Sequence, residues 1–342
     1  MKAVRFHSHG DVSVLRYEDA PAPLARPGDV VVRVRACALN RLDLWQRRGL
    51  DRVTIPLPHI SGADVAGEIL TVGEGTTDWV PGDRVMLQPG LSCGRCAACL
   101  AGHDNRCPRY DVLGYQSAGG YAERVAVPAA NLIRLPAHVG FESAAAFPLA
   151  FLTAWHMLFH RAALAEGETV LVIGAGSGVG QAALQLARHA RARVIVTAGG
   201  AEKCARAREL GAELAIDRQA DDVVAAVRHA TNGRGVDVVV EHVGVATWAE
   251  SVRCLAKGGR LVTCGATTGH EASLDLRHLF ARQLSLLGSY MGEKAELLRV
   301  SALFFAGHIA PVVDRTFPLS DAAQAHRYLE ESRQFGKVVL VV

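Results

Sequence analysis

Four cysteines lie within fifteen consecutive positions, at Cys93, Cys96, Cys99 and Cys107, in the pattern CxxCxxCx7C. Short loops with this spacing can fold four thiolates into a tetrahedron, which is the geometry of a structural zinc site. Because four cysteines fill every coordination position, no place remains for water or substrate. We therefore predict one zinc ion that holds the loop over 89–108 in shape and does no chemistry. Disulfides or an empty reduced cluster are the alternatives.

A glycine-rich turn is the second feature with chemical meaning. The stretch VLVIGAGSGVGQAALQLA at 170–187 places small residues between an apolar strand and an amphipathic helix. Backbone can then approach a pyrophosphate closely, and the helix N-terminus offers it free N–H groups. The strict GxGxxG spacing is absent, because Val179 stands where its third glycine would be. We expect this turn to bind a dinucleotide through Gly174, Gly176, Ser177, Gly178, Val179 and Gly180.

The end of the next predicted strand, at 192–199, indicates which dinucleotide is bound. A carboxylate there would accept a hydrogen bond from a ribose 2′-hydroxyl, but Thr197 is followed by Ala-Gly-Gly. Lys203 and Arg218 lie nearby in the sequence and could pair with a 2′-phosphate. We therefore predict NADP(H), with Gly199, Lys203 and Arg218 in its site. The alternative is that both cations are solvated surface charges.

The remaining composition excludes several classes of function. The 342 residues are 50% hydrophobic and 21% charged, with a formal net charge of +3 and both signs interspersed, so no basic face for nucleic acid or anionic lipid is expected. The first residues, MKAVRFHSHG, lack the apolar core of a signal peptide, which favours a cytoplasmic location. The longest apolar run starts at Ala144 and is shorter than a membrane span, so we expect a buried helix there.

The elements that must position these residues form two domains of different character. Residues 1–140 show short strands between Pro-Gly and Gly-Asp turns, which predicts an irregular, mostly antiparallel barrel or sandwich. From residue 168 strands and helices alternate, with helices expected at 177–190, 201–212, 221–233 and 247–259. Strands that are apolar on both faces and joined by helices indicate a doubly wound parallel sheet, hence an α/β protein. We place one domain at 1–150 and 291–342, and the other at 151–290.

Taken together, these features resemble the medium-chain dehydrogenase/reductase superfamily over essentially the full length. The resemblance implies a GroES-like irregular β-barrel catalytic domain and a Rossmann domain. In the zinc alcohol dehydrogenases of that superfamily a Cys, a His and a second Cys hold a catalytic zinc; the matching positions here are Asn40, Ala63 and Leu149. The motifs ALNRLD and SGADVAG are similar to the quinone oxidoreductase branch, which works without catalytic metal. That branch usually lacks the four-cysteine loop, so the chain combines features of both groups.

The resemblance implies an NADPH-dependent reductase that transfers hydride to a quinone or an α,β-unsaturated carbonyl compound. We expect Asn40 to donate a hydrogen bond to the developing oxyanion, with Asp43 and Asp64 orienting its loop. The alternative is that the Asn40 side chain braces the backbone at a strand end. By resemblance, the nicotinamide would be framed by Thr153, Val243, Gly244, Cys264, Gly265 and Ala266.

Two other functions stay open from the sequence. One is a zinc alcohol dehydrogenase with a displaced metal site built from Cys37, His59 and Asp64. The other is a non-catalytic NADPH-binding protein. In each case the partner would be a small molecule, and a homodimer or homotetramer is expected because the strand at 283–291 resembles the edge strand through which family members pair.

Overall fold

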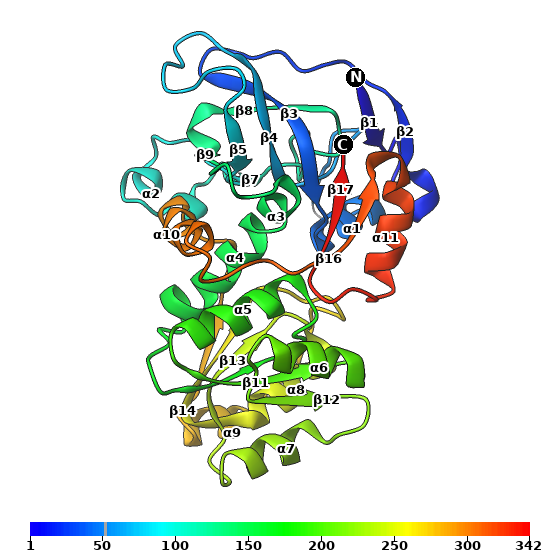
Figure 1. Cartoon of the computed structure of the whole chain (residues 1–342). Helices are drawn as coiled ribbons and strands as arrows, with labels where there is room; N and C mark the ends of the chain where they lie inside the picture. Colours follow the sequence, from blue (N-terminus) through cyan, green and yellow to red (C-terminus); the bar gives the residue numbers. More distant parts are fainter. Residues whose placement is uncertain (51–52) are drawn as a thin grey trace. The chain divides into compact units, whose positions relative to one another are not determined.

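The computed structural model describes residues 1–50 and 53–342. The chain divides into two compact units (Figure 1). The first comprises Met1–Leu149 together with Glu293–Val342, and the second comprises Ala150–Gly292. Among the described residues, no helix has the length and apolar character needed to cross a bilayer.

The first unit is built on a seven-stranded sheet in the order β16-β17-β3-β4-β5-β9, with β8 pairing β3. All its pairs are antiparallel except β16 with β17. The valines of β3 supply its core because alternate residues of DVVVRVRACA point to one face. The strands are β3 (Asp29–Ala38), β4 (Asp64–Val72), β5 (Arg84–Leu87), β8 (Arg124–Pro128), β9 (Leu132–Arg134), β16 (Val313–Pro318) and β17 (Lys337–Val341).

The register of β3 determines where polar residues meet. Its first half pairs with β8, and its second half pairs with β17, where Val339 lies opposite Ala38. On its other side Ala38 lies opposite Asp64, the first residue of β4. The last strand of the chain therefore begins beside the end of β3. Two small sheets complete this unit, made of β1 (Lys2–Arg5) with β2 (Arg16–Asp19) and of β6 (Gly90–Leu91) with β7 (Asp111–Val112).

Helix α1 (Arg41–Arg48) starts immediately after β3 and was not predicted from the sequence. Asn40, expected at a strand end, is its N-cap, and the Asp43 carboxylate accepts a hydrogen bond of 2.7 Å from the Asn40 N–H. This is half of a capping box, in which the N3 side chain satisfies the N-cap backbone donor. The spacing Asn-x-x-Asp in ALNRLD was the available signal. The other helices of this unit are α2 (Ala97–Leu100), α3 (Phe141–Ala145), α10 (Lys294–Phe305) and α11 (Ala322–Glu330).

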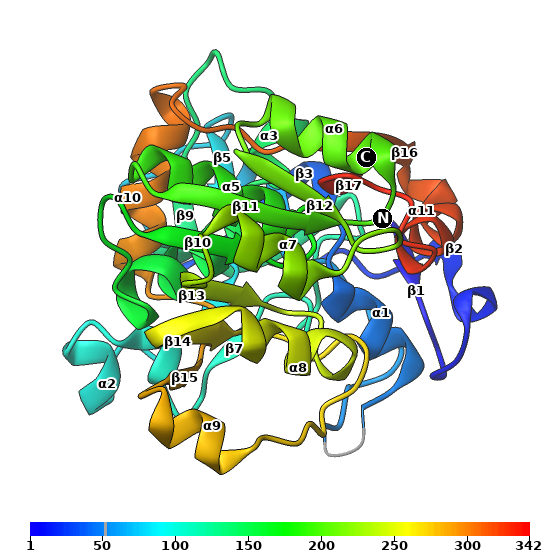
Figure 2. The ribbon, with the colours of Figure 1, turned by 90° about the horizontal axis from the view of Figure 1, so that it is seen from below.

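The second unit contains a six-stranded, wholly parallel sheet in the order β12-β11-β10-β13-β14-β15. Helices α5 and α6 lie against one face and α7 and α8 against the other, so both faces are buried (Figures 1 and 2). The strand order runs outward in opposite directions from β10 and β13, so the carboxyl ends of these two strands form the topological switch point where such sheets bind ligands. The strands are β10 (Thr169–Val172), β11 (Arg193–Ala198), β12 (Leu214–Asp217), β13 (Val236–Glu241), β14 (Leu255–Thr263) and β15 (Ser285–Gly288).

One predicted helix of this unit is wrong at its end. The helix expected over 247–259 ends at Cys254, and β14 starts at Leu255. Gly258, with φ +76°, lies inside a shift of register between β14 and β13 and lets the strand bulge there. The helices are α4 (Pro148–Trp155), which crosses the boundary between the units, α5 (Gly178–His189), α6 (Ala201–Glu209), α7 (Val223–Ala230), α8 (Val245–Cys254) and α9 (Leu276–Ala281), of which α9 was not predicted.

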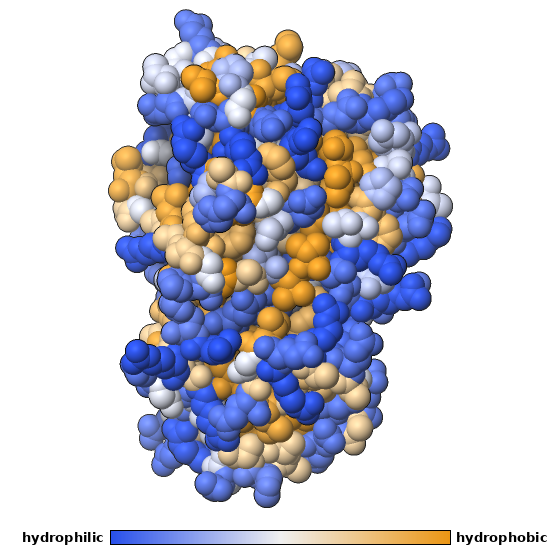
Figure 3. Space-filling view, in the orientation of Figure 1, coloured by the Kyte–Doolittle hydropathy of each residue, from blue (hydrophilic) through white to orange (hydrophobic). Residues whose placement is uncertain are grey.

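Apolar side chains fill a separate core in each unit. On the face shown in Figure 3, hydrophilic residues cover most of the surface and apolar residues appear in groups between them. Several large apolar residues are nevertheless exposed near the last strand of the parallel sheet: Leu276, Phe280 and Tyr290.

Candidate active site and metal centre

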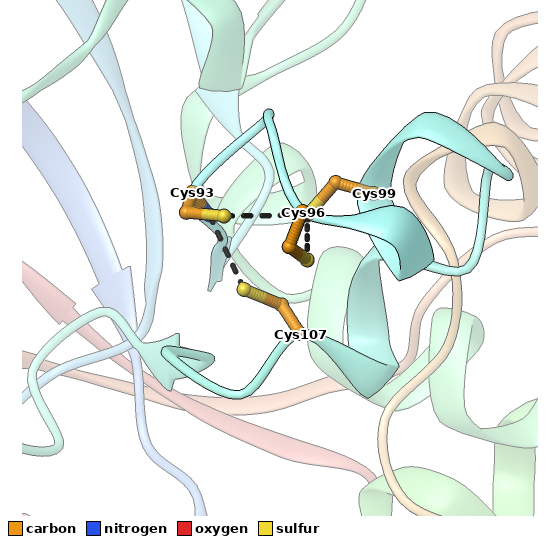
Figure 4. Close-up of side chains that lie close together, drawn as sticks. All are labelled: Cys93, Cys96, Cys99 and Cys107. Atoms are coloured by element: carbon orange, nitrogen blue, oxygen red, sulfur yellow. Dashed lines mark hydrogen bonds between the residues drawn. The ribbon is translucent and has the colours of Figure 1, made fainter.

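The four cysteines of the loop over 89–108 point their sulfur atoms toward one another (Figure 4). The Cys99 sulfur lies 3.5 Å from that of Cys96 and 3.9 Å from that of Cys93, and all four sulfurs lie within 4.8 Å of one another. Tetrahedral zinc with Zn–S bonds of about 2.3 Å separates its ligand atoms by about 3.8 Å. The thiols that the sequence singled out therefore fit a structural zinc ion.

Hydrogen bonds already favour a thiolate within this cluster. The backbone N–H of Arg95, followed by the Arg109 side chain, lowers the pKa of Cys93 to about 5. The pKa of Cys96 is raised to about 11, because burial and the adjacent thiols outweigh a hydrogen bond from the backbone of Cys99. Neighbouring thiolates repel one another, so hydrogen bonds alone cannot ionise all four. A divalent cation would supply the missing positive charge.

The cysteine loop is attached to the start of α10. The N–H of Lys294 donates to Asp104 Oδ1 at 2.9 Å, and His103 Nδ1 lies 2.6 Å from Glu293 Oε1. Asp104 and His103 belong to the loop that the cysteines would close around a metal. Loss of the metal would therefore loosen the N-terminus of α10 as well as the loop.

A buried polar cluster forms where β3 ends and where β4 and β17 begin. Lys337 Nζ lies 2.9 Å from Asp64 Oδ2 and donates to Asn40 Oδ1 at 2.6 Å. Asn40 Nδ2 donates to the same Asp64 Oδ2 at 2.9 Å, and the Leu149 N–H donates to Asp64 Oδ1 at 2.8 Å. The side chains of Lys337 and Asp64 are 3% and 0% exposed. Asn40 and Asp64 thus meet as expected of one site, together with a lysine that the sequence did not identify.

Asp43, the third carboxyl or amide group predicted for this site, ends a chain of buried hydrogen bonds. The Tyr121 hydroxyl donates to Asp43 Oδ2 at 3.0 Å, and His326 Nε2 lies 3.2 Å from that hydroxyl. Arg47 Nη1 donates to His326 Nδ1 at 3.1 Å, which leaves the imidazole proton on Nε2. Arg47 also pairs with Glu330. Burial raises the pKa of Asp43 to about 6 and lowers the pKa of His326 to about 3.

The residues of the alternative metal site do not gather. Cys37 is fully buried, and burial raises the pKa of its thiol well above the usual range. His59 Nε2 lies 3.0 Å from the carbonyl oxygen of Gly114. Within the described part of the chain, the clusters of potential ligand atoms within 4.8 Å of one another do not include Cys37 with His59 and Asp64.

In the second unit, the glycine-rich turn connects β10 to α5. Gly174 has φ +69°, a conformation that favours glycine, and its N–H donates to Thr197 Oγ1 at 3.0 Å. Ser177 is the N-cap of α5 and accepts from the Gly180 N–H at 2.8 Å. A methyl group on Gly180 would lie 2.2 Å from the carbonyl oxygen of Gly174, so only glycine fits. The other predicted contacts lie in this turn and the first turn of α5: Gly176, Gly178 and Val179.

Two cations from other elements, Lys203 and Arg218, are the ones predicted to bind a ribose phosphate at the end of β11. A methyl group on Gly199 would lie 3.6 Å from the Arg218 guanidinium, and Lys203 lies in the first turn of α6. The last residue of the neighbouring strand β12 is an acid, Asp217. Its Oδ1 accepts a hydrogen bond of 2.9 Å from the Gly200 N–H, so the carboxylate lies at the end of β11. A search for this acid along β11 alone misses Asp217, because it comes from the adjacent strand.

The turn after β13 is held by a buried acid that sequence reasoning also missed. Glu241 accepts hydrogen bonds from the N–H groups of Val243 and Gly244, at 3.1 and 2.8 Å, and from the Thr247 hydroxyl at 2.7 Å. Beside this turn, His242 Nε2 lies 3.1 Å from Ser177 Oγ. The predicted residues Val243 and Ser177 therefore lie at one switch point, at the carboxyl ends of adjacent strands.

The remaining predicted residues lie in the same unit. Burial raises the pKa of Cys264 to about 12, so its thiol is not a nucleophile at neutral pH. A methyl group on Gly265 would lie 3.0 Å from the carbonyl oxygen of His242. Thr153 lies in α4 and is 5% exposed.

Comparison with known proteins agrees with this arrangement. Residues 26–137 match the alcohol dehydrogenase GroES-like domain, and residues 178–306 match the zinc-binding dehydrogenase family. An acryloyl-coenzyme A reductase of Metallosphaera sedula is 32% identical, with 99% of each chain covered. A quinone oxidoreductase of Lama guanicoe is 29% identical over 100% of this chain and 98% of its own. The structure of an NAD-dependent alcohol dehydrogenase is 46% identical, with a TM-score of 0.97 and both chains covered in full.

The chain therefore belongs to the medium-chain dehydrogenase/reductase superfamily, and it is an oxidoreductase. The superfamily and the α/β fold expected from the sequence, with a GroES-like domain and a Rossmann sheet, are confirmed.

Proposed function

We propose that the protein reduces a quinone or an α,β-unsaturated carbonyl compound with NADPH, without a catalytic zinc. The observation that carries the proposal is the buried cluster of Asn40, Asp64 and Lys337. Asn40, Ala63 and Leu149, the three positions where the resemblance would place zinc ligands, offer no thiolate or imidazole. Both oxygens of Asp64 are already hydrogen-bonded. A zinc ion therefore finds no suitable set of donors here.

The proposed reaction needs a donor beside the reacting oxygen. NADPH, when bound, supplies a hydride. As the hydride adds to the electron-poor carbon, the π electron pair moves toward the carbonyl oxygen, and a proton taken up afterwards completes the product. The Asn40 amide has one Nδ2 proton directed to Asp64, and the second can stabilise the negative charge that develops on the oxygen. Asp43 orients the loop through the Asn40 backbone N–H.

The names of two relatives support this class of substrate. The acryloyl group named for the relative from Metallosphaera sedula is an α,β-unsaturated acyl group, and quinones are conjugated in the same way. Both kinds of acceptor are already electron-poor, so they do not need the polarisation that a metal gives to a simple carbonyl.

We assign the 2′-phosphate of NADPH to Arg218 and Lys203. The guanidinium of Arg218 lies against Gly199, the first residue after β11, where a phosphate can approach closely. One observation favours NADH instead, namely the Asp217 carboxylate in the same place. The alcohol dehydrogenase of 46% identity is also named for NAD. The choice between NADPH and NADH is tested by measuring the affinity of each cofactor for three proteins. These are the unmutated protein, Arg218→Ala and Asp217→Asn.

The four-cysteine loop is assigned a structural zinc ion held by Cys93, Cys96, Cys99 and Cys107. Such an ion stabilises the loop and its attachment to α10, and it supplies no reactive centre. Metal analysis of the purified protein should return one zinc per chain. Two per chain would contradict the assignment of a single site.

A zinc alcohol dehydrogenase remains the second candidate, favoured by the similarity to the NAD-dependent alcohol dehydrogenase. The experiment that separates the two measures NADPH oxidation with para-benzoquinone, phenanthrenequinone and methyl vinyl ketone, and NADP⁺ reduction with primary and secondary alcohols. Each assay is run with and without a mild chelator. Alcohol oxidation that is fastest and is abolished by the chelator would overturn our proposal. Cofactor binding without turnover on any of these substrates would contradict the proposed class of acceptor.

The role of Asn40 is tested by Asn40→Ala. Loss of a donor aimed at a developing oxyanion lowers turnover by about 10²-fold or more. An unchanged rate would leave Asn40 as a helix cap and assign the oxyanion to other donors.

We also propose that the protein forms a homodimer through β15. Within the part of the chain that the structure describes, this strand pairs with β14 on one side only, and Leu276, Phe280 and Tyr290 nearby are 65%, 70% and 57% exposed. An open strand edge flanked by exposed apolar residues is a typical site of association.

A further inference from the structure

We propose that Lys337 is a positioning residue that fixes the side-chain amide of Asn40 in the orientation required to donate to the reacting oxygen. The inference rests on the proposed function, because it concerns how the Asn40 donor is prepared. It goes beyond that function by assigning a role to the ammonium group of a residue 297 positions away in the sequence.

The chemistry of the two partners of Asn40 allows only one orientation of the amide. Lys337 Nζ, 2.6 Å from Asn40 Oδ1, is a donor without acceptor capacity. The ionised Asp64 Oδ2, 2.9 Å from Asn40 Nδ2, is an acceptor without donor capacity. Rotation of the amide by half a turn would place the donor Nδ2 against the donor Lys337 Nζ. It would also place the acceptor Oδ1 against the acceptor Asp64 Oδ2. Lys337 and Asp64 together therefore exclude the flipped amide.

The same contacts polarise the donor. The positive charge of Lys337 lies at the oxygen end of the Asn40 amide, in a place where its side chain is 3% exposed. Hydrogen bonds in a low-dielectric interior strengthen one another, so a cation at Oδ1 makes the N–H groups of Nδ2 stronger donors. In this way the ammonium acts on the oxyanion through Asn40 without touching it.

The fold explains why a lysine can be held there. Lys337 is the first residue of β17, which pairs with the end of β3 at Ala38. Asp64 starts β4 on the other side of β3, also opposite Ala38. The sheet register therefore places Asp64 opposite Ala38 on one side of β3, and Lys337 two residues before Val339, the partner of Ala38 on the other side. A cation and an anion thus lie on either side of the segment that leads into Asn40. Each charge compensates the other, which a buried ion pair requires.

A test through Asn40 separates positioning from simple support of the fold. We expect Lys337→Met alone to destabilise the protein, since it leaves Asp64 buried without a counter-charge. The informative variant is the charge-neutral pair Asp64→Asn with Lys337→Met. Its single-turnover hydride transfer to para-benzoquinone or methyl vinyl ketone should be slower by about 10- to 100-fold, while the NADPH dissociation constant changes less than about threefold.

The decisive comparison repeats the same pair in the Asn40→Ala background. If Lys337 acts through the amide, the pair should then change the rate by less than about threefold, because no amide remains to be oriented. The same loss in both backgrounds, or no loss in either, would overturn the proposal. The exposed pair Lys2–Asp19, with a similar separation of 3.0 Å, provides the control: Lys2→Met with Asp19→Asn should leave the rate unchanged.

A second measurement keeps this inference testable if the proposed function is wrong and no acceptor is turned over. The Nδ2 protons of Asn40, identified by their loss in Asn40→Ala, are observed by nitrogen-15 NMR. Their exchange with solvent should be at least about tenfold faster in the Asp64→Asn, Lys337→Met variant, because the orienting partners are gone. Equal exchange rates would refute the orienting role, whatever the substrate.

Discussion

Asp43→Asn should change how the stability of the protein depends on pH. Burial raises the pKa of Asp43 from 3.8 to about 6 in the folded state. A shift of this size corresponds to about 3 kcal/mol, at 1.36 kcal/mol for each pKa unit. The folded state binds the proton more tightly than the unfolded state, so stability is highest below the unfolded pKa. The stability that this proton contributes is lost as the pH rises from the unfolded pKa through the folded pKa. Above the folded pKa, Asp43 causes no further change in stability with pH.

The measurement is a double difference. Free energies of unfolding in urea are determined for the unmutated protein and for Asp43→Asn across this pH window, and the values are subtracted at each pH. Subtraction removes the pH dependence of all other groups, including the cysteines. From the acid side of the unfolded pKa to neutral pH, the unmutated protein should lose about 3 kcal/mol relative to the variant, since asparagine does not titrate.

Asp83 provides a control with the opposite sign. Burial alone would raise its pKa, but hydrogen bonds from Arg134 and from the Val80 N–H lower it below the usual value. Its contribution to stability is therefore present above the unfolded pKa and is lost as the pH falls, so the difference for Asp83→Asn should slope the other way. Parallel curves of unfolding free energy against pH for the unmutated protein and Asp43→Asn would refute the raised pKa of the buried Asp43 carboxyl.

Four further outcomes are expected. Cys93→Ser should lower the melting temperature and the zinc content more than the turnover of the protein that folds, measured on the soluble fraction. Gly180→Ala should weaken dinucleotide binding in a fluorescence titration, because the new methyl group would meet the carbonyl oxygen of Gly174 at 2.2 Å. Arg218→Ala should weaken NADPH binding by about 1.5–3 kcal/mol and NADH binding little; equal losses would contradict a phosphate contact. Phe280→Asp should lower the mass measured by light scattering if β15 forms the dimer, and an unchanged dimer would place the interface elsewhere.

Local patterns predicted the elements well where strand and helix signals were strong. The alternation of β3, the glycine-rich turn and the four cysteines each depend on residues close in the sequence, and the fold and family read from them are confirmed. The bulge after Cys254 was missed, since LAKGG continues an apparently helical pattern until the pairing with β13 decides otherwise. Helix α1 was missed although its capping pattern could be read.

The candidate site was harder to predict because its partners are distant in the sequence. Lys337 is separated from Asp64 by 273 positions, and a lysine ahead of VVLVV looks like a solvated strand end. The pairing of β17 with β3 is what brings it to Asn40 and Asp64. Asp217 was missed for a similar reason, since the search for an acid followed β11 while the carboxylate comes from the adjacent β12. Glu241 resembled an ordinary strand residue until its three donors were seen.

The buried series of hydrogen bonds from Arg47 through His326 and Tyr121 to Asp43 does not conduct protons. To conduct, every link would have to accept a proton on one side and release one on the other. Arg47 does not release a proton in proteins, and the pKa of His326, about 3, opposes uptake of one. All donors in the chain point the same way, toward Asp43. In the proposed reaction, the proton that completes the product would therefore arrive by another route, and the solvent isotope effect on turnover should be the same in Tyr121→Phe as in the unmutated protein.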